Sequence, residues 1–112
     1  MPNKTLQFDN IALAVHPKNQ EAYILAEKIG ASLEKEGKKI LLGRMDDNTL
    51  REEVISGRQD LLIALGGDGT MLRAGHISAA AQVPILGINL GSYGFLTEVQ
   101  RDEWESALAR VL

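Results

Sequence analysis

The residues best suited to chemistry form a glycine-rich run, Gly-Gly-Asp-Gly-Thr at positions 66–70, directly behind the apolar segment 61–65. Glycine lets the backbone turn tightly and lets a ligand approach the main chain closely. Backbone N–H groups at the start of a following helix attract phosphate oxygens, because that end of a helix carries a partial positive charge. Thr70 can cap the helix or bond a phosphate. The pattern predicts a site for a phosphorylated ligand.

A single carboxylate, Asp68, lies in the middle of this loop. Its charge repels phosphate, so its presence indicates contact with a hydroxyl group or with a phosphate-bound metal ion. A carboxylate that faces a hydroxyl can orient it and accept its proton during phosphoryl transfer. The run has neither the Gly-Lys-Ser/Thr ending of a Walker loop nor the spacing of a dinucleotide fingerprint. The structural alternative is a tight strand-to-helix turn in which Asp68 caps the helix.

Strands and helices are predicted to alternate around this loop. The strands are predicted at 11–15, 39–42, 61–65 and 85–90. Two helices are predicted at 19–36 and 70–82. Two more begin at capping boxes: one at Thr49 and Glu52, which ends near 57, and one at Asp102 and Glu105, which continues to Leu112. The strands are apolar without alternation, which is typical of a parallel sheet with helices on both faces. The fold class is therefore α/β, a three-layer α-β-α arrangement around a mostly parallel sheet. Ligands bind beyond the carboxyl ends of the strands in such sheets.

Local signals set the ends of several elements. Pro17 is predicted in the first turn of the first helix, and Gly37 is predicted to end that helix at the C′ position. His16, at a strand end near the expected ligand edge, is interpreted as a turn residue rather than a base. Trp104 and Leu108 are four residues apart on the last helix and are interpreted as core or domain-contact residues.

Composition narrows the classes of function. A chain of 112 residues, 45% of them hydrophobic, is expected to be one domain with a packed core. The formal net charge of −3 and the absence of a basic block disfavour nucleic acid as the main partner. There are no cysteines, which excludes disulfides and thiolate chemistry. No run reaches the roughly 18 apolar residues of a membrane span. We expect no membrane partner and a cytoplasmic location.

Two motifs together resemble those of the NAD kinase family. Residues 65–72, Leu-Gly-Gly-Asp-Gly-Thr-Met-Leu, look like its signature, and Pro-Ile-Leu-Gly-Ile-Asn at 84–89 with Gly-Phe-Leu at 94–96 resembles its second N-terminal motif. The similarity spans most of residues 10–100. Diacylglycerol and sphingosine kinases carry a related Gly-Gly-Asp-Gly, and phosphofructokinases a Gly-Gly-Asp pattern. The second motif is what selects NAD kinase.

The resemblance implies a Rossmann-like, phosphofructokinase-like domain and a set of residue roles. Asp68 would contact the 2′-hydroxyl of the adenosine ribose of NAD and act as proton acceptor. Gly69 would contact the same nucleotide, and Phe95 would press on its adenine unless it is a core residue at the sheet edge. The residues implied along the donor phosphates are Gly66, Gly67, Thr70 and, unless it lies on a solvated helix face, Arg73. Asn89 is interpreted as a structural hydrogen-bonding residue.

The resemblance also implies the activity of a longer protein. That enzyme would transfer the terminal phosphoryl of ATP or polyphosphate to NAD, with a divalent ion such as Mg²⁺ on the donor phosphates. Family members carry a second, β-rich domain with an Asn-Glu/Asp motif, and the last helix here reaches Leu112 without a stop signal. We therefore expect residues 1–112 to be the N-terminal domain of a truncated chain, inactive alone and homo-oligomeric at full length. Ser92 and Tyr93 depart from the basic residue and Leu of many members, which puts a phosphate contact there in doubt.

Two other functions stay open at this point. The first is a related kinase whose acceptor is a lipid or a sugar phosphate, because the first motif is shared with such enzymes. The second is a nucleotide-binding module without catalytic activity, because the chain supplies only one wall of the site that the resemblance implies.

Overall fold

The computed structural model describes residues 8–90, 99–100 and 103–111. In chain order the elements are β1 (Asn10–Val15), α1 (Gln20–Lys35), β2 (Lys39–Arg44), α2 (Asn48–Ile55), β3 (Leu61–Gly66), α3 (Asp68–Ala79), β4 (Ile85–Asn89), β5 (Val99–Gln100) and α4 (Trp104–Val111). The alternation of strands and helices follows the apolar segments of the sequence.

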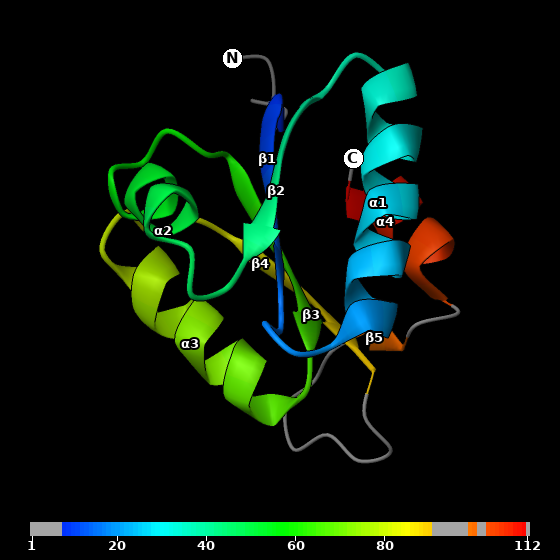
Figure 1. The fold of residues 1–112 in the computed structure, drawn as a ribbon. Coiled ribbons are helices and arrows are strands. Elements are labelled where there is room, and N and C mark those ends of the chain that lie inside the picture. Colours follow the sequence, from blue (N-terminus) through cyan, green and yellow to red (C-terminus); the bar gives the residue numbers. More distant parts are fainter. Residues whose placement is uncertain (1–7, 91–98, 101–102, 112) are drawn as a thin grey trace, which may run out of the picture.

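The strands form a single parallel sheet in the order β2-β1-β3-β4-β5. Helices α1 and α4 lie on one face of this sheet, and α2 and α3 lie on the other (Figure 1). The three-layer α/β fold predicted from the sequence is therefore confirmed. The short strand β5 was not predicted, because two residues carry no periodic signal.

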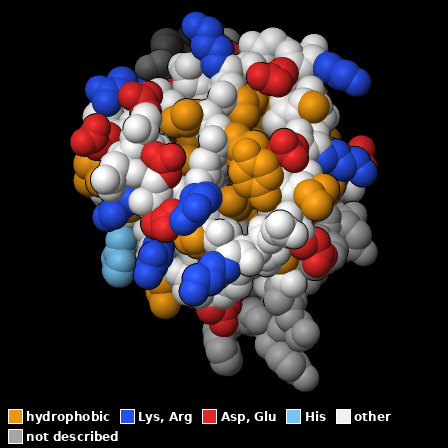
Figure 2. All heavy atoms as spheres, in the orientation of Figure 1, with side chains coloured by type: hydrophobic (Ala, Val, Ile, Leu, Met, Phe, Trp, Pro, Cys, Tyr) orange, Lys and Arg blue, Asp and Glu red, His pale blue; other side chains and the backbone are white. Residues whose placement is uncertain are grey.

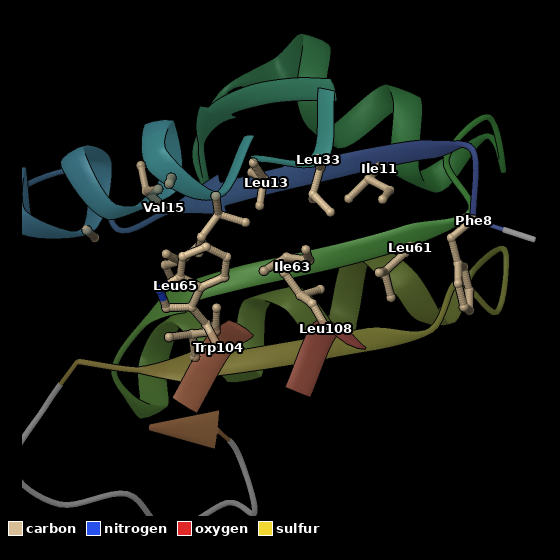
Figure 3. Packing of buried hydrophobic residues seen from close by; sticks show 14 residues of the cluster. Phe8, Ile11, Leu13, Val15, Leu33, Leu61, Ile63, Leu65, Trp104 and Leu108 are labelled. Atoms are coloured by element: carbon tan, nitrogen blue, oxygen red, sulfur yellow. The ribbon is translucent and has the colours of Figure 1, made fainter. Parts of the chain in front are cut away.

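The core divides between the two faces because side chains alternate along each strand. On the α1 and α4 face, alternate residues of β1 and β3 pack with Leu33, Trp104 and Leu108 (Figure 3). The intervening residues pack on the other face against α2 and α3. Both central strands are thus buried on both faces, which explains their lack of polar residues. The interpretation of Trp104 and Leu108 as core residues is confirmed.

The first helix begins later than its proline signal indicated. Asn19 is the N-cap residue, and its side-chain oxygen accepts a hydrogen bond from the Ala22 N–H at 3.0 Å. Because this cap fixes the first helical residue as Gln20, Pro17 lies in the preceding turn, and its placement in the helix was wrong. Gly37 follows the helix with a φ of 85°, as expected for a C′ glycine.

The second helix begins at a different cap from the one predicted. Asp47 accepts hydrogen bonds from the backbone N–H groups of Thr49 at 2.8 Å and Leu50 at 3.2 Å. The capping box at Thr49 and Glu52 was wrong, because Asp47 is the N-cap and the helix begins at Asn48, so Thr49 is already a helical residue. The other capping box begins at Asp102, which lies outside the described residues.

Two differences in length affect the functional edge. The helix α3 begins at Asp68 rather than Thr70, and it ends at Ala79, before Gln82, which has a φ of 53°. The strand β2 continues to Arg44, two residues past its predicted end at Leu42. A charged side chain is therefore positioned at the carboxyl end of this edge strand.

Candidate functional site

The strand order creates a crevice beside the glycine loop. From β1 the chain moves outward to β2 on one side, whereas from β3 it moves outward to β4 on the other. The helices that follow β1 and β3 consequently cover opposite faces of the sheet (Figure 1). Ligands in open α/β sheets bind at such a switch point, beyond the carboxyl ends of the strands. The loop after β1 and the loop after β3 both lie at this position.

Gly66 is required by the packing of the loop itself. A Cβ atom added to Gly66 would lie 2.8 Å from the Cβ of Thr70, closer than real Cβ atoms approach. Thr70 is buried, with 3% of its surface exposed. It is the third residue of α3, and the N-cap is Gly67, so neither Thr70 nor Asp68 caps the helix. Gly66 and Thr70 form a tight joint between strand and helix.

Gly67 and Gly69 have no such packing role among the described residues. A Cβ atom added to either would meet no described atom within 4 Å. Neither residue has a positive φ, so the backbone conformation accepts other residues as well. The two glycines therefore leave open space next to the main chain, at the N-terminal end of α3, which no side chain caps. Backbone N–H groups beside open space are suited to binding an anion.

Asp68 is the first residue of α3, and its side chain is partly buried. The carboxylate of Asp68 lies in the first helical turn, at the helix end that carries a partial positive charge. A charged carboxylate in this position can accept a hydrogen bond or a proton from a hydroxyl group.

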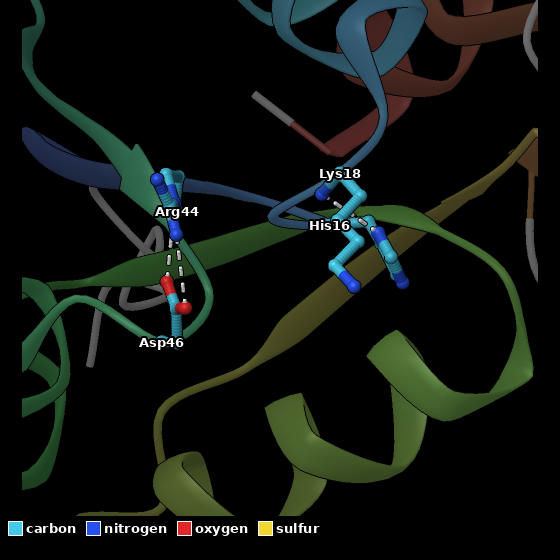
Figure 4. A network of polar contacts seen from close by, with 4 residues as sticks. All are labelled: His16, Lys18, Arg44 and Asp46. Atoms are coloured by element: carbon cyan, nitrogen blue, oxygen red, sulfur yellow. Dashed lines mark hydrogen bonds and ion pairs between the residues drawn. The ribbon is translucent and has the colours of Figure 1, made fainter.

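A groove of about 560 Å³ extends from the glycine loop to the ends of β1 and β2. Its polar lining comes from the β1–α1 turn, from the end of β2 and from α3, and it includes His16, Lys18, Arg44, Asp46, Gly69 and Arg73. Figure 4 shows four of these side chains, and Figure 2 shows Lys and Arg side chains gathered on this part of the surface. The groove has the size of a small-molecule site.

The charges in this groove are mostly positive, although the chain as a whole is negative. Arg44 forms a fork with Asp46, in which Nε donates to Oδ1 at 3.2 Å and Nη2 donates to Oδ2 at 3.1 Å (Figure 4). The hydrogen bond from Arg44 lowers the pKa of Asp46, and the positive charges of Arg44 and Arg73 act in the same direction. Asp46 is therefore ionised at neutral pH and neutralises part of the charge of Arg44.

The sequence located one side of this site and missed the other. The predicted residues from Gly66 to Thr70 and Arg73 come together at the start of α3, where Arg73 is exposed and lines the groove. Phe95 lies outside the described residues. Lys18 and Arg44 were missed, although each lies beyond a strand at the carboxyl edge. The signal that identifies them is the strand order, which a single sequence does not give.

Two further interpretations concern residues near the site. The Nδ1 atom of His16 accepts a hydrogen bond from the Lys18 N–H at 3.1 Å, and the His16 N–H donates to the Leu65 carbonyl at 3.1 Å. These bonds confirm His16 as a turn residue. Asn89 pairs in register with Gly66 on the neighbouring strand and is buried, as expected of a structural residue.

The described residues carry a limited set of metal ligands. They contain no group of three or more His, Asp or Glu side chains that could hold a metal ion. A Mg²⁺ ion carried by substrate phosphates needs only one or two protein carboxylates. Asp68, beside the open space of the loop, fits that smaller requirement.

No helix in the described part of the chain is long and apolar enough to cross a membrane.

The doubly wound sheet and the glycine loop at its switch point identify an α/β protein whose ligand edge is at the carboxyl ends of β1 and β3. The chain belongs to the family described as the ATP-NAD kinase N-terminal domain, whose model matches residues 32–112. This assignment agrees with the resemblance of the two sequence motifs.

Several relatives carry the name NAD kinase. The protein of Nitratidesulfovibrio vulgaris strain DP4 is 39% identical over 105 residues, covering 92% of this chain and 34% of its own length. That of Moorella thermoacetica is 51% identical over 71 residues, covering 63% of this chain and 22% of its own length. That of Shewanella denitrificans is 35% identical and covers 99% of this chain and 38% of its own length. The chain thus spans about a third of the length of the relatives that it matches.

Alanine substitutions separate the two kinds of glycine in the loop. We expect Gly66→Ala to lower the free energy of unfolding by about 1–3 kcal/mol, because the new methyl group overlaps Thr70. Gly69→Ala meets open space inside a helix, so stability should be unchanged or slightly raised. Urea denaturation measures both values. Equal losses for the two variants would show that Gly69 is also held by packing.

The Arg44–Asp46 fork makes a prediction about titration. In the folded protein the pKa of Asp46 should lie below its ordinary value of 3.8 and return towards it in Arg44→Gln. Because the pKa is lower in the folded state, the fork's contribution to stability is present above pH about 4 and is lost as the pH falls through the folded pKa. Carboxyl NMR titration measures this. An Asp46 pKa that is unchanged by Arg44→Gln would contradict the fork.

Proposed function

We propose that this chain is the N-terminal domain of an NAD kinase, which transfers the terminal phosphoryl group of ATP or polyphosphate to NAD. The observation that carries the proposal is family membership over residues 32–112. The space at Gly67 and Gly69 supports it, because no described atom lies within 4 Å of a Cβ added at either residue, and a phosphorylated ligand needs accessible main-chain N–H groups.

Asp68 has the central role in the proposed reaction. The 2′-hydroxyl oxygen of the adenosine ribose of NAD forms a bond to the terminal phosphorus of the donor. The bond from that phosphorus to the bridging oxygen breaks, and the hydroxyl proton passes to the carboxylate of Asp68. With ATP the products are NADP and ADP. The position of Asp68 in the first turn of α3, beside the glycine loop, supports this role, because a carboxylate there can accept a proton from a hydroxyl group.

The glycine loop contributes binding and orientation in this proposal. Gly69 contacts NAD, while Gly66, Gly67 and Thr70 lie along the donor phosphates. Arg73, one turn further along α3, neutralises phosphate charge. Phe95 is proposed to contact the adenine. A divalent ion, most simply Mg²⁺, would be carried by the donor phosphates and would supply charge neutralisation there.

The second half of the active site is proposed to come from a β-rich domain that follows this one. Relatives of about three times the length of this chain support that arrangement. We also propose a homo-oligomeric enzyme in the cytoplasm, as the family resemblance implies. Kinases with lipid or sugar-phosphate acceptors receive less support, because the relatives reported above are named NAD kinases.

Replacing the proposed base tests this function. In the two-domain enzyme, Asp68→Asn should lower NADP formation about a hundredfold or more, because the amide cannot accept the proton. The matched control is Asp47→Asn, the same chemical change at a helix N-cap where Asn is equally suitable. The measurements are NADP production and the thermal midpoint of each variant. Near-normal turnover in Asp68→Asn would exclude the proposed role, and transfer of phosphate to a lipid or sugar phosphate but not to NAD would exclude the proposed function.

A further inference from the structure

The groove continues beyond every residue that the proposed function uses. Its far side consists of the β1–α1 turn, with Lys18, and the end of β2, with Arg44. These side chains reach the groove from the opposite side to Gly69 and Arg73. The groove thus has cationic residues on both sides, and the N-terminal end of α3, with its partial positive charge, borders it.

Among the described residues, much of this positive charge has no ion-pair partner. Neither Lys18 nor Arg73 forms an ion pair with any of the described residues. The fork to Asp46 uses Nε and Nη2 of Arg44, and its Nη1 has no hydrogen-bond partner in the described part of the chain. Three cationic side chains thus line this groove with a single carboxylate, that of Asp46, although the chain has a net charge of −3.

The lining of the groove favours a phosphate chain over a nucleoside. Its apolar members are Pro17 and Met45, and His16 supplies the single aromatic ring among the described residues that line it. Three cationic side chains, Lys18, Arg44 and Arg73, outnumber this ring, and Arg and Lys donors match phosphate oxygens. A linear oligophosphate carries several charges along its length and can contact both sides of the groove.

We propose that this groove binds the phosphate chain of the phosphoryl donor, with Lys18 and Arg44 as its outer binding residues. The inference rests on the proposed kinase function and extends its donor site. The phosphates nearest the reaction lie at the glycine loop, and the remainder of the chain lies between Arg73 on one side and Lys18 and Arg44 on the other. The shared chemistry is an oligophosphate, present both in ATP and in inorganic polyphosphate.

A substitution of Asp46 removes a negative charge from the groove, whereas a substitution of Lys18 or Arg44 removes a positive one. The carboxylate of Asp46 repels phosphate and competes with phosphate for the guanidinium of Arg44. Removing this charge frees Arg44 and lowers the repulsion, so binding should become tighter. A residue with a purely structural role in the fork would not improve binding when it is lost.

Binding of inorganic tripolyphosphate to the 112-residue chain tests the proposal by isothermal titration calorimetry at low salt. Lys18→Gln and Arg44→Gln should each weaken binding about threefold to tenfold, and Asp46→Asn should tighten it about twofold to fivefold. The matched controls are Lys39→Gln and Arg58→Gln. Lys39 is the first residue of β2, and Arg58, which lies just before β3, forms an ion pair with Glu53. Both controls change one charge at the amino edge of the sheet and should bind as wild type. Melting curves verify folding.

Several outcomes would overturn the proposal. They are the absence of tripolyphosphate binding by the wild type, wild-type affinity in Lys18→Gln and Arg44→Gln, and equal weakening in the two controls. In the two-domain enzyme, the KM for the donor should rise in both groove variants while the KM for NAD stays unchanged. A rise for ATP and polyphosphate alike supports a shared phosphate-chain site, and a rise for one of them identifies the source.

The failure of this inference is distinguishable from failure of the kinase proposal. If the wild-type two-domain enzyme forms no NADP, but tripolyphosphate binding changes as described when Lys18, Arg44 and Asp46 are substituted, the groove is an oligophosphate site and the kinase assignment is wrong. If NADP forms normally and the groove variants keep their donor KM, the kinase assignment stands and the groove proposal falls.

Discussion

The parallel pairing of β1 with β3 is the constraint on which the rest of the structure depends. It matches Ile11 with Leu61 through to Val15 with Leu65, and both strands are buried on both faces. Because the chain turns to opposite sides after these two strands, their carboxyl ends lie between the start of α1 and the start of α3 (Figure 1). The glycine loop, the cationic groove and the N-terminal end of α3 all take their positions from this pairing.

Glycine has two separate functions at this edge. At Gly66 it permits close contact with Thr70, and that contact joins β3 tightly to α3. At Gly67 and Gly69 it leaves space that the described protein atoms do not fill. The first arrangement stabilises the turn between strand and helix. The second is where we propose that a phosphorylated ligand binds, at a helix end that no described side chain caps.

The sequence predicted the sheet and its helices, and it indicated the glycine loop as a candidate site, because those features depend on local patterns. Apolar runs fixed β1 and β3, and the glycines with Asp68 fixed the loop. The helix caps at Asn19 and Asp47 were placed less accurately, since several residues at each end can accept the same N–H bonds. Lys18 and Arg44 could not be assigned, because their proximity depends on β1 lying between β2 and β3, a tertiary arrangement that no local pattern encodes.

Phosphate binding at the space over residues 67–70 is tested most directly by NMR. A ¹⁵N-labelled sample of the 112-residue chain is titrated with tripolyphosphate, and the backbone amide resonances are followed. We expect the largest shifts at Gly67, Asp68, Gly69 and Thr70, with smaller shifts at Lys18 and Arg44. Shifts that are confined to other parts of the protein, with the amides of residues 67–70 unmoved at saturation, would contradict it.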